Sequence, residues 1–249
     1  MRNSLPENKI AVITIHGGCG EELKRTLDSI DKQIIKPDLN LVIIKKMNNF
    51  DFKFYKKKYR KFIIGKDKSL WNAMNIGIKY TKKFNIIFLN SGDKFFSKKS
   101  IKFISYELKK NYNCPLIFKT ILKYKKNLFY PKKKYFNDDQ YSPHPSFIRQ
   151  SINKSKIEYF NEKNKINADG FWMRNIRKKK YMKINRVISV YYLGGRSSNP
   201  SLGSVRNLLE FDTFGGIKEL FKYLLCKLLS QEIYYKVLYS LKFEIKTER

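Results

Sequence analysis

Residues 67–93 have the sequence DKSLWNAMNIGIKYTKKFNIIFLNSGD. The first half predicts a helix over residues 69–82, because its apolar side chains recur at helical spacing. The run NIIFL at 85–89 predicts a buried strand, and NSGD at 90–93 predicts a turn at the carboxyl end of that strand. A helix that leads into a buried strand is the repeating unit of an α/β fold.

The same alternation continues on both sides of this stretch. The runs IAVITIH and LNLVII predict two further strands, and a segment with apolar residues at helical spacing lies between them. The expected strands cover residues 10–16, 39–44, 62–64 and 187–193, with one or two more in 116–130, and the expected helices cover 23–30, 101–108 and 169–177. Residues 132–143 are expected to form a loop. We therefore predict an α/β fold with a mostly parallel central sheet flanked by helices, whose ligands bind at the carboxyl ends of the strands.

The chain of 249 residues is strongly basic. Lys and Arg number 53 against 21 Asp and Glu, which gives a formal charge of +32 and predicts a negatively charged partner. The three cysteines form no CxxC pair, so they indicate neither a disulfide framework nor a zinc ribbon, and they suit a reducing cytosol. No apolar run reaches the ~18 residues that are needed to span a bilayer.

The C-terminal part has a different pattern. Apolar residues in 217–229 fall on a single helical stripe, and Lys218, Lys222 and Lys227 lie off it. A second, aromatic-rich stretch covers 233–243. A cationic helix with a broad apolar stripe is typical of segments that lie on an anionic membrane surface. Packing of the stripe on the rest of the chain or on a second subunit is the alternative.

The turn at 90–93 also carries a candidate for chemistry. Asp93 lies at the carboxyl end of a predicted strand, where a carboxylate can hold Mg²⁺ or Mn²⁺ against a diphosphate. An ordinary turn, in which Ser, Gly and Asp are favoured for backbone reasons, explains the same tetrapeptide.

The wider context favours a site. Residues 67–93 resemble the block DxGIYDAMNxGI…FLNSGD of family 2 glycosyltransferases, in the branch that makes colanic acid, capsule and lipopolysaccharide. Four further segments resemble motifs of this family in the same order, namely LKRTLDSIDKQ at 23–33, PHPSFIR at 143–149, ADGFWMR at 168–174 and GGRSS at 194–198. The resemblance extends from about residue 9 to about residue 210.

The resemblance implies a GT-A fold and a metal-dependent, inverting glycosyltransferase. The expected partners are Mn²⁺ or Mg²⁺, a nucleotide-sugar donor, and a glycan or lipid-linked glycan as acceptor. Residues 1–203 are expected to form the catalytic domain, and residues 204–249 a helical segment that associates with the membrane. The expected location is the cytoplasm, peripheral on the inner face of the cell membrane.

The resemblance also implies roles for individual residues. Asp93 is expected to bind the metal, with Ser91 in place of the first acid of the usual DxD motif. Asp169 is expected to be the general base that takes a proton from the acceptor hydroxyl, and a helix N-cap is its alternative role. The residues expected to contact the nucleotide sugar are His16, Asp67, Asn75, Asn90, Ser91, His144 and Arg196. Trp71 and Trp172 are expected in the core.

One position departs from the family pattern. Lys45 follows the strand at 39–44, where the family commonly has an Asp that binds the uracil ring. Lys45 is therefore expected at the nucleotide, and the nucleotide itself, UDP by family default, is left open.

Two other functions account for parts of the sequence. An NADP-binding oxidoreductase would explain Gly18 and Gly20 after a strand, but GCGEEL lacks the third Gly or Ala of GxGxxG. A nucleic-acid-binding protein would explain the charge and the aromatic residues interleaved with lysine. The chain shows no RNP, KH, finger or helix-turn-helix pattern, so no specific nucleic-acid partner is expected.

Overall fold

The computed structural model describes most of the chain. The described residues are 8–45, 52–65, 68–111, 114–138, 144–149, 158–163, 168–178, 180–195 and 198–248. Two of the predicted site residues, Asp67 and Arg196, lie outside these ranges, and so does the side chain of His144.

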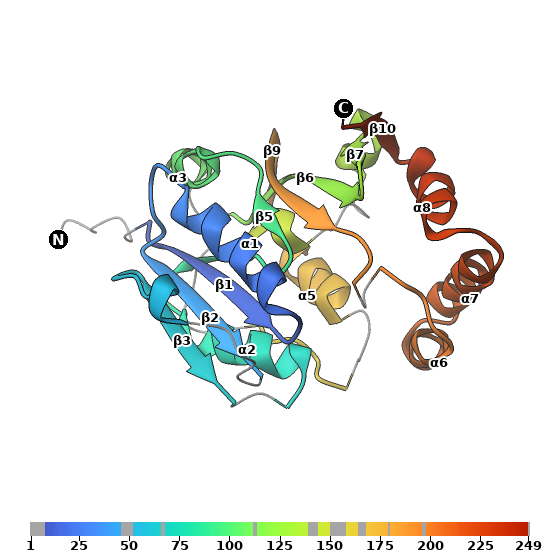
Figure 1. Ribbon diagram of the computed structural model, residues 1–249, viewed down its shortest axis with the longest axis horizontal. Coiled ribbons are helices and arrows are strands. Elements are labelled where there is room, and N and C mark those ends of the chain that lie inside the picture. Colours follow the sequence, from blue (N-terminus) through green and yellow to red (C-terminus); the bar gives the residue numbers. More distant parts are fainter. Residues whose placement is uncertain are drawn as a thin grey trace.

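Four parallel strands form one half of the central sheet. They are β1 (Ile10–His16), β2 (Leu39–Ile44), β3 (Arg60–Ile64) and β4 (Asn85–Phe88), in the order β3-β2-β1-β4. Figure 1 shows β3, β2 and β1 side by side. β1 is buried along its whole length between β2 and β4, which explains why its sequence is a nearly continuous apolar run. The strand order reverses between β1 and β4, which is where sheets of this kind bind ligands.

The other half of the sheet contains the antiparallel pairs. β8 (Phe147–Arg149) lies between β4 and β6 (Leu116–Tyr124) and is antiparallel to both. β7 (Asn127–Pro131) and β10 (Phe243–Thr247) extend this edge, again antiparallel. The long strand β9 (Met182–Tyr192) runs parallel to β6 and pairs with the two residues of β5 (Lys94–Phe95).

Helices cover both faces of the sheet, and the side chains of β1 point alternately to one face and to the other. Ile10 and Val12 pack into the cluster beneath α1 (Gly20–Asp31) and α3 (Ser100–Lys110). Ala11, Ile13 and Ile15 pack into the opposite cluster, beneath α2 (Leu70–Tyr80) and α5 (Ala168–Arg177). The predicted α/β fold with its mostly parallel sheet is therefore confirmed, and the expected core residues Trp71 and Trp172 are buried.

Helix α2 approaches β1 closely at Gly77. A Cβ atom at this position would lie 2.8 Å from Cγ2 of Ile13, which is closer than side chains in a packed core tolerate. The glycine in the motif AMNIGI therefore has a packing role.

The prediction of a loop over residues 132–143 was wrong for part of this range. The structure has a short helix there, α4 (Lys133–Asn137), which buries Phe136 in the core. Phe136 follows three lysines and one tyrosine, and one buried residue cannot show a helical period. The sequence pattern therefore did not predict the helix.

The C-terminal segment forms three helices and returns to the sheet. The helices are α6 (Leu202–Phe211), α7 (Thr213–Leu228) and α8 (Gln231–Ser240), and β10 then pairs with β7 (Figure 1). Tyr234, Tyr235 and Phe243 form a third apolar cluster with residues of β6 and β7. None of the helices in the described part of the chain has the length and apolar character that a bilayer crossing requires.

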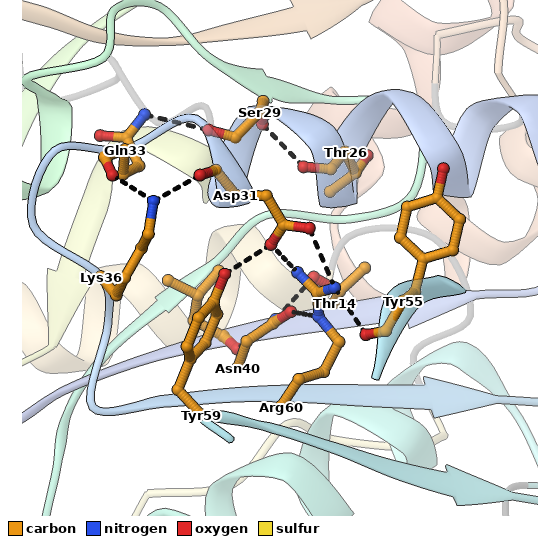
Figure 2. A network of polar contacts seen from close by, with 11 residues as sticks. Thr14, Thr26, Ser29, Asp31, Gln33, Lys36, Asn40, Tyr55, Tyr59 and Arg60 are labelled. Carbon is orange, nitrogen blue, oxygen red and sulfur yellow. Dashed lines mark hydrogen bonds and ion pairs between the residues drawn. The ribbon is translucent and has the colours of Figure 1, made fainter. Parts of the chain in front are cut away.

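A polar network ties α1 to the amino ends of β2 and β3 (Figure 2). The Arg60 side chain is fully buried and donates to Asp31 Oδ1 over 2.6 Å and to Asn40 Oδ1 over 2.6 Å. Tyr59 also donates to Asp31 Oδ1, over 2.5 Å, and burial together with this hydrogen bond raises the pKa of Tyr59. The network lies at the amino ends of these strands, away from the carboxyl ends where a ligand is expected, and we assign it a structural role.

Substitution Arg60→Met is expected to destabilise the protein by about 3 kcal/mol, because it leaves the Asp31 carboxylate and the buried Asn40 amide without their cation. Urea denaturation measures this loss. Lys57→Met, at an exposed neighbouring position, is the control and should change the free energy of unfolding by less than about 0.5 kcal/mol. An equal, small effect of both substitutions would contradict this role of the network.

Candidate functional site

Predicted site residues meet at the carboxyl ends of β1, β2 and β4. His16 ends β1 and is buried, and its Nδ1 shares a hydrogen bond of 2.9 Å with Ser91 Oγ. The backbone N–H of Ser91 donates to Ile15 O over 3.0 Å, so the turn after β4 continues alongside β1. On the other side, the N–H of Lys45 donates to His16 O over 3.1 Å. The structure therefore brings His16, Ser91 and Lys45 together.

Thr26 of α1 holds the turn Asn90–Asp93. Its Oγ1 donates to Asp93 O over 2.6 Å and accepts from the N–H of Gly92 over 3.0 Å, and Asn90 O lies 3.2 Å away. Gly92 has φ +103°, a conformation that glycine adopts without strain. The turn is thus shaped by a glycine and fixed by one hydroxyl group.

Ser29 of α1 and Gln33, two residues beyond the end of this helix, continue this contact along the chain. Ser29 Oγ accepts from the N–H of Phe95 over 3.2 Å. Gln33 accepts from the N–H of Ile101 over 3.0 Å and donates to Ser97 O over 2.8 Å. Thr26 and Ser29 are three residues apart and lie on one side of the helix, and Gln33 follows four residues after Ser29. We call these three side chains, of which Gln33 lies just beyond the helix, the polar ladder of α1.

Substitution Thr26→Val is expected to destabilise the protein by about 1–3 kcal/mol, because the backbone groups of Gly92 and Asp93 lose their partner at a buried site. Thermal unfolding measures the loss. Thr213→Val, at an exposed position on α7, is the matched control. A Thr26→Val protein as stable as the control would show that the hydroxyl does not hold the turn.

Asp93 lies in basic and largely buried surroundings. Its side chain is almost fully buried, and Oδ1 accepts from the N–H of Tyr192, at the end of β9, over 3.1 Å. The guanidinium of Arg25 lies 4.2 Å from the centre of the Tyr192 ring, and the ammonium of Lys94 lies 6.0 Å from it. These cations lie around the Tyr192 ring, in the residue whose N–H binds Asp93, and they favour an anion such as a diphosphate at this end of β9.

The described side chains provide few ligands for a divalent cation. Within the described ranges, no group of three or more His, Cys, Asp or Glu side chains is arranged to hold a metal ion. A cation beside Asp93 would therefore be held by one carboxylate together with the oxygens of a diphosphate and water, which is a common arrangement for Mg²⁺. The donor set fits a cation that arrives with its substrate.

Glu22 is a further candidate site residue, which no pattern in the sequence singled out. Its carboxylate lies against two glycines: a Cβ on Gly18 would be 2.5 Å from Glu22 Oε2, and one on Gly92 would be 4.0 Å from Glu22 Cδ. It also interacts electrostatically with His16. Glu22 precedes Thr26 by one helical turn, and this spacing is the signal that could have indicated it.

Burial and the Glu22 carboxylate shift the pKa of His16 in opposite directions. Burial lowers the pKa of His16 below its ordinary value of 6.5, and the Glu22 carboxylate partly raises it. The imidazole is therefore neutral at pH 7. Because the unfolded chain binds the proton more readily, His16 stabilises the fold above pH 6.5, and this contribution is lost as the pH falls toward the lower folded-state pKa.

An NMR titration of the histidine side chains is expected to give a midpoint below 6.5 for His16. Glu22→Gln should lower this midpoint further, because it removes the charge that favours the imidazolium form. Glu21→Gln, at the exposed neighbouring acid, should leave the midpoint near that of the unmodified protein. A higher midpoint in the Glu22→Gln protein would contradict the placement of the carboxylate.

Asn75 lies on the other face of the sheet and holds the segment that precedes α5. Its Oδ1 accepts from the N–H of Phe160 over 2.7 Å, and its Nδ2 donates to Phe160 O over 3.0 Å and to Glu162 Oε1 over 2.9 Å. The Phe160 ring stacks between Trp71, at 5.6 Å, and Trp172, at 4.7 Å. Contact of Asn75 with a donor sugar stays a prediction.

Asp169 is the second residue of α5 and is half-buried. Its Oδ1 accepts from the N–H of Gly170 over 2.9 Å, so the carboxylate lies at the N-terminal end of the helix. Trp172, one turn further along, contacts the ring of Phe88, the last residue of β4, with ring centres 5.9 Å apart. Helix α5 therefore begins near the same edge of the sheet as the turn that carries Asp93. The role of Asp169 as a base stays a prediction.

Comparison with solved structures identifies the fold. The described architecture is similar to that of Staphylococcus aureus TarS, a glycosyltransferase. The fragment TarS 1–349 aligns with a TM-score of 0.63 and 14% identity over 90% of this chain and 76% of that one. Its complex with UDP-GlcNAc aligns with a TM-score of 0.64 and 15% identity over 87% of this chain and 71% of that one. The chain has the GT-A fold.

The chain matches less than half of a longer TarS structure. It spans 43% of that structure, which aligns with a TM-score of 0.59 and 14% identity over 87% of this chain. No protein-family model matches the sequence. No curated protein sequence matches it either.

Proposed function

We propose that this protein is an inverting glycosyltransferase that transfers a sugar from a nucleotide-sugar donor to a lipid-linked or surface-glycan acceptor, in the synthesis of lipopolysaccharide, capsule or a related polysaccharide. One observation carries the proposal: the turn Asn90–Asp93 lies beside His16 at the reversal of strand order, in a chain with the fold of TarS. TarS has been crystallised with UDP and with UDP-GlcNAc.

The chemistry follows from the two acids. Asp93 would hold the donor diphosphate through a divalent cation, Mn²⁺ or Mg²⁺, which stabilises the negative charge of the leaving group. The carboxylate of Asp169 would take the proton of an acceptor hydroxyl as its oxygen attacks the anomeric carbon. The bond between that carbon and the diphosphate oxygen breaks on the opposite face, so the configuration inverts and a nucleoside diphosphate leaves.

The remaining predicted residues would bind the donor. Ser91 and Asn90 belong to the turn itself, and neutral His16 can share a hydrogen bond with the donor or with Ser91. Lys45 is exposed at the carboxyl end of β2, where the base of the nucleotide would lie. Because a lysine stands there, the proposal does not fix the base of the nucleotide, and UDP is the first candidate to test.

An NADP-binding oxidoreductase is less compatible with the structure. In that class the pyrophosphate binds at the N-terminus of the helix that follows the first strand. Here the Glu22 carboxylate lies against Gly18 at that position, so a negative charge stands where the pyrophosphate would bind.

The proposed location follows from the acceptor. A lipid-linked acceptor would be met at the inner face of the cell membrane, and the basic chain, with its charge of +32, would be attracted to anionic lipids there. The division into a catalytic domain at residues 1–203 and a membrane-associated segment at 204–249 is part of this proposal.

Asp93→Asn and Asp169→Asn are expected to lower kcat by about 10²-fold or more, but for different reasons. Asp93→Asn should abolish the dependence of donor binding on Mn²⁺ in a calorimetric titration, whereas Asp169→Asn should leave that binding intact. Glu210→Gln, at an exposed acid of α6, is the control and should keep full turnover. Turnover that survives both aspartate substitutions would refute the proposed chemistry.

The donor is found by measuring thermal shift and hydrolysis with UDP-, GDP-, CMP- and dTDP-sugars, each with Mn²⁺ or Mg²⁺. We expect one nucleotide to stabilise the protein in a metal-dependent way. A response to NADPH with no response to any nucleotide sugar would instead favour the oxidoreductase.

A further inference from the structure

The apolar stripe that the sequence predicts on the C-terminal segment is largely exposed in the structure. On α7, the exposed fractions of Phe214, Ile217, Phe221, Leu224 and Leu228 are 67, 57, 64, 50 and 80%. Their spacing of three and four residues places them on one side of the helix. We call these five side chains the docking stripe. A row of large apolar side chains that are each half-exposed or more marks an interaction surface.

The opposite side of α7 is fixed to the rest of the protein. Gly216 is buried so closely against Leu209 of α6 that a Cβ there would lie 2.5 Å from that side chain. Glu219 accepts from Ser204 of α6 over 3.2 Å. Cys226 packs on the cluster that α8 and β10 form with the sheet. The docking stripe is therefore the outer side of a helix whose inner side is already in contact.

Cations flank the docking stripe on both sides. At 3.6 residues per turn, Lys218 and Lys222 follow the stripe on one flank and Lys227 on the other. Lys218 Nζ lies 4.1 Å from the centre of the Phe214 ring, so its charge stands directly beside the docking stripe. The single acid of α7, Glu219, is paired with Lys222 over 3.1 Å.

We infer that the docking stripe binds the surface of an anionic phospholipid bilayer. Apolar side chains at the centre and lysines at the rim match the acyl layer and the phosphate headgroups of such a surface. This inference deepens the membrane partner in the proposed function, and binding to lipid needs neither donor nor transfer chemistry.

A second copy of the chain is the competing occupant, because the same spacing suits packing of one helix on another. Charge disfavours it. Two copies would each bring a charge of +32 and would oppose lysine rims across the contact, with no free acid on α7 to compensate. An anionic surface removes this repulsion instead of adding to it.

Flotation of the full-length protein with lipid vesicles tests the inference. Vesicles of phosphatidylglycerol and phosphatidylcholine in equal parts are expected to carry the protein, and vesicles of phosphatidylcholine alone should carry at least 10-fold less. The double substitution Phe221→Ser and Leu224→Ser should lower binding to the anionic vesicles at least 10-fold. The matched control is Phe54→Ser, which removes an equally exposed phenylalanine from the short helix Phe52–Tyr55 and should bind as the unmodified protein does.

A second variant separates charge from apolar contact. Lys218→Gln with Lys227→Gln keeps the docking stripe but should weaken vesicle binding and make it less sensitive to salt. Equal binding of all variants to anionic vesicles would overturn the inference. A second outcome would also overturn it. In that outcome the unmodified protein does not bind vesicles and forms a dimer in sedimentation equilibrium, and the serine substitutions convert this dimer to monomers. Donor hydrolysis in solution should be the same in every variant as in the unmodified protein. Absence of hydrolysis from the unmodified protein, with vesicle binding intact, would count against the proposed function alone.

Discussion

The site depends on how the chain is held after it leaves the sheet. Beyond Phe88 the backbone of residues 90–101 no longer has strand partners on both sides, yet much of it is buried, and its N–H and C=O groups still need hydrogen bonds. The polar ladder of α1 provides them, with Thr26 on the turn and Gln33 at the start of α3. Because Leu23, Leu27 and Ile30 of the same helix fill the core, α1 fixes the turn and the sheet relative to each other.

The amino ends and the carboxyl ends of the parallel strands differ in how far their polar groups are already hydrogen-bonded to one another. At the amino ends of the strands, Arg60, Asp31 and Asn40 satisfy one another and leave little polar capacity for a ligand. At the carboxyl ends, neutral His16, the Ser91 hydroxyl and the Glu22 carboxylate face a turn built on glycine. In the described part of the chain, these polar groups at the carboxyl ends can accept further hydrogen bonds from a ligand. This separation suits a transferase, because the hydrogen bonds that hold the fold together then lie away from the groups that bind and release a substrate.

Sequence patterns predicted the parts of the fold that long apolar runs define. The strand at 39–44 was predicted with the bounds that β2 has, and the helix at 69–82 exceeds α2 by one or two residues at each end. β5 and β8, of two and three residues, are too short to show a period. β10 begins at the last residue of the aromatic-rich stretch at 233–243 and was not predicted. At the site, the motif positions of Thr26 and Asn75 were visible in the sequence. Their partners were not, because Thr26 binds residues more than 60 positions away and Asn75 binds residue 160. Glu22 was missed for the same reason.

The end of β9 connects the C-terminal segment to the candidate site. The N–H of Tyr192 binds Asp93 Oδ1, while its neighbours Tyr191 and Leu193 pack into the cluster that contains Tyr234 and Tyr235 of α8. Alternation along a strand sends successive side chains to opposite sides, so one short stretch contacts both regions. The pairing of β10 with β7 adds a second connection between the C-terminal segment and the sheet. A surface that binds α7 would consequently be held in a defined orientation to Asp93, which is what an enzyme needs if its acceptor is anchored in that surface.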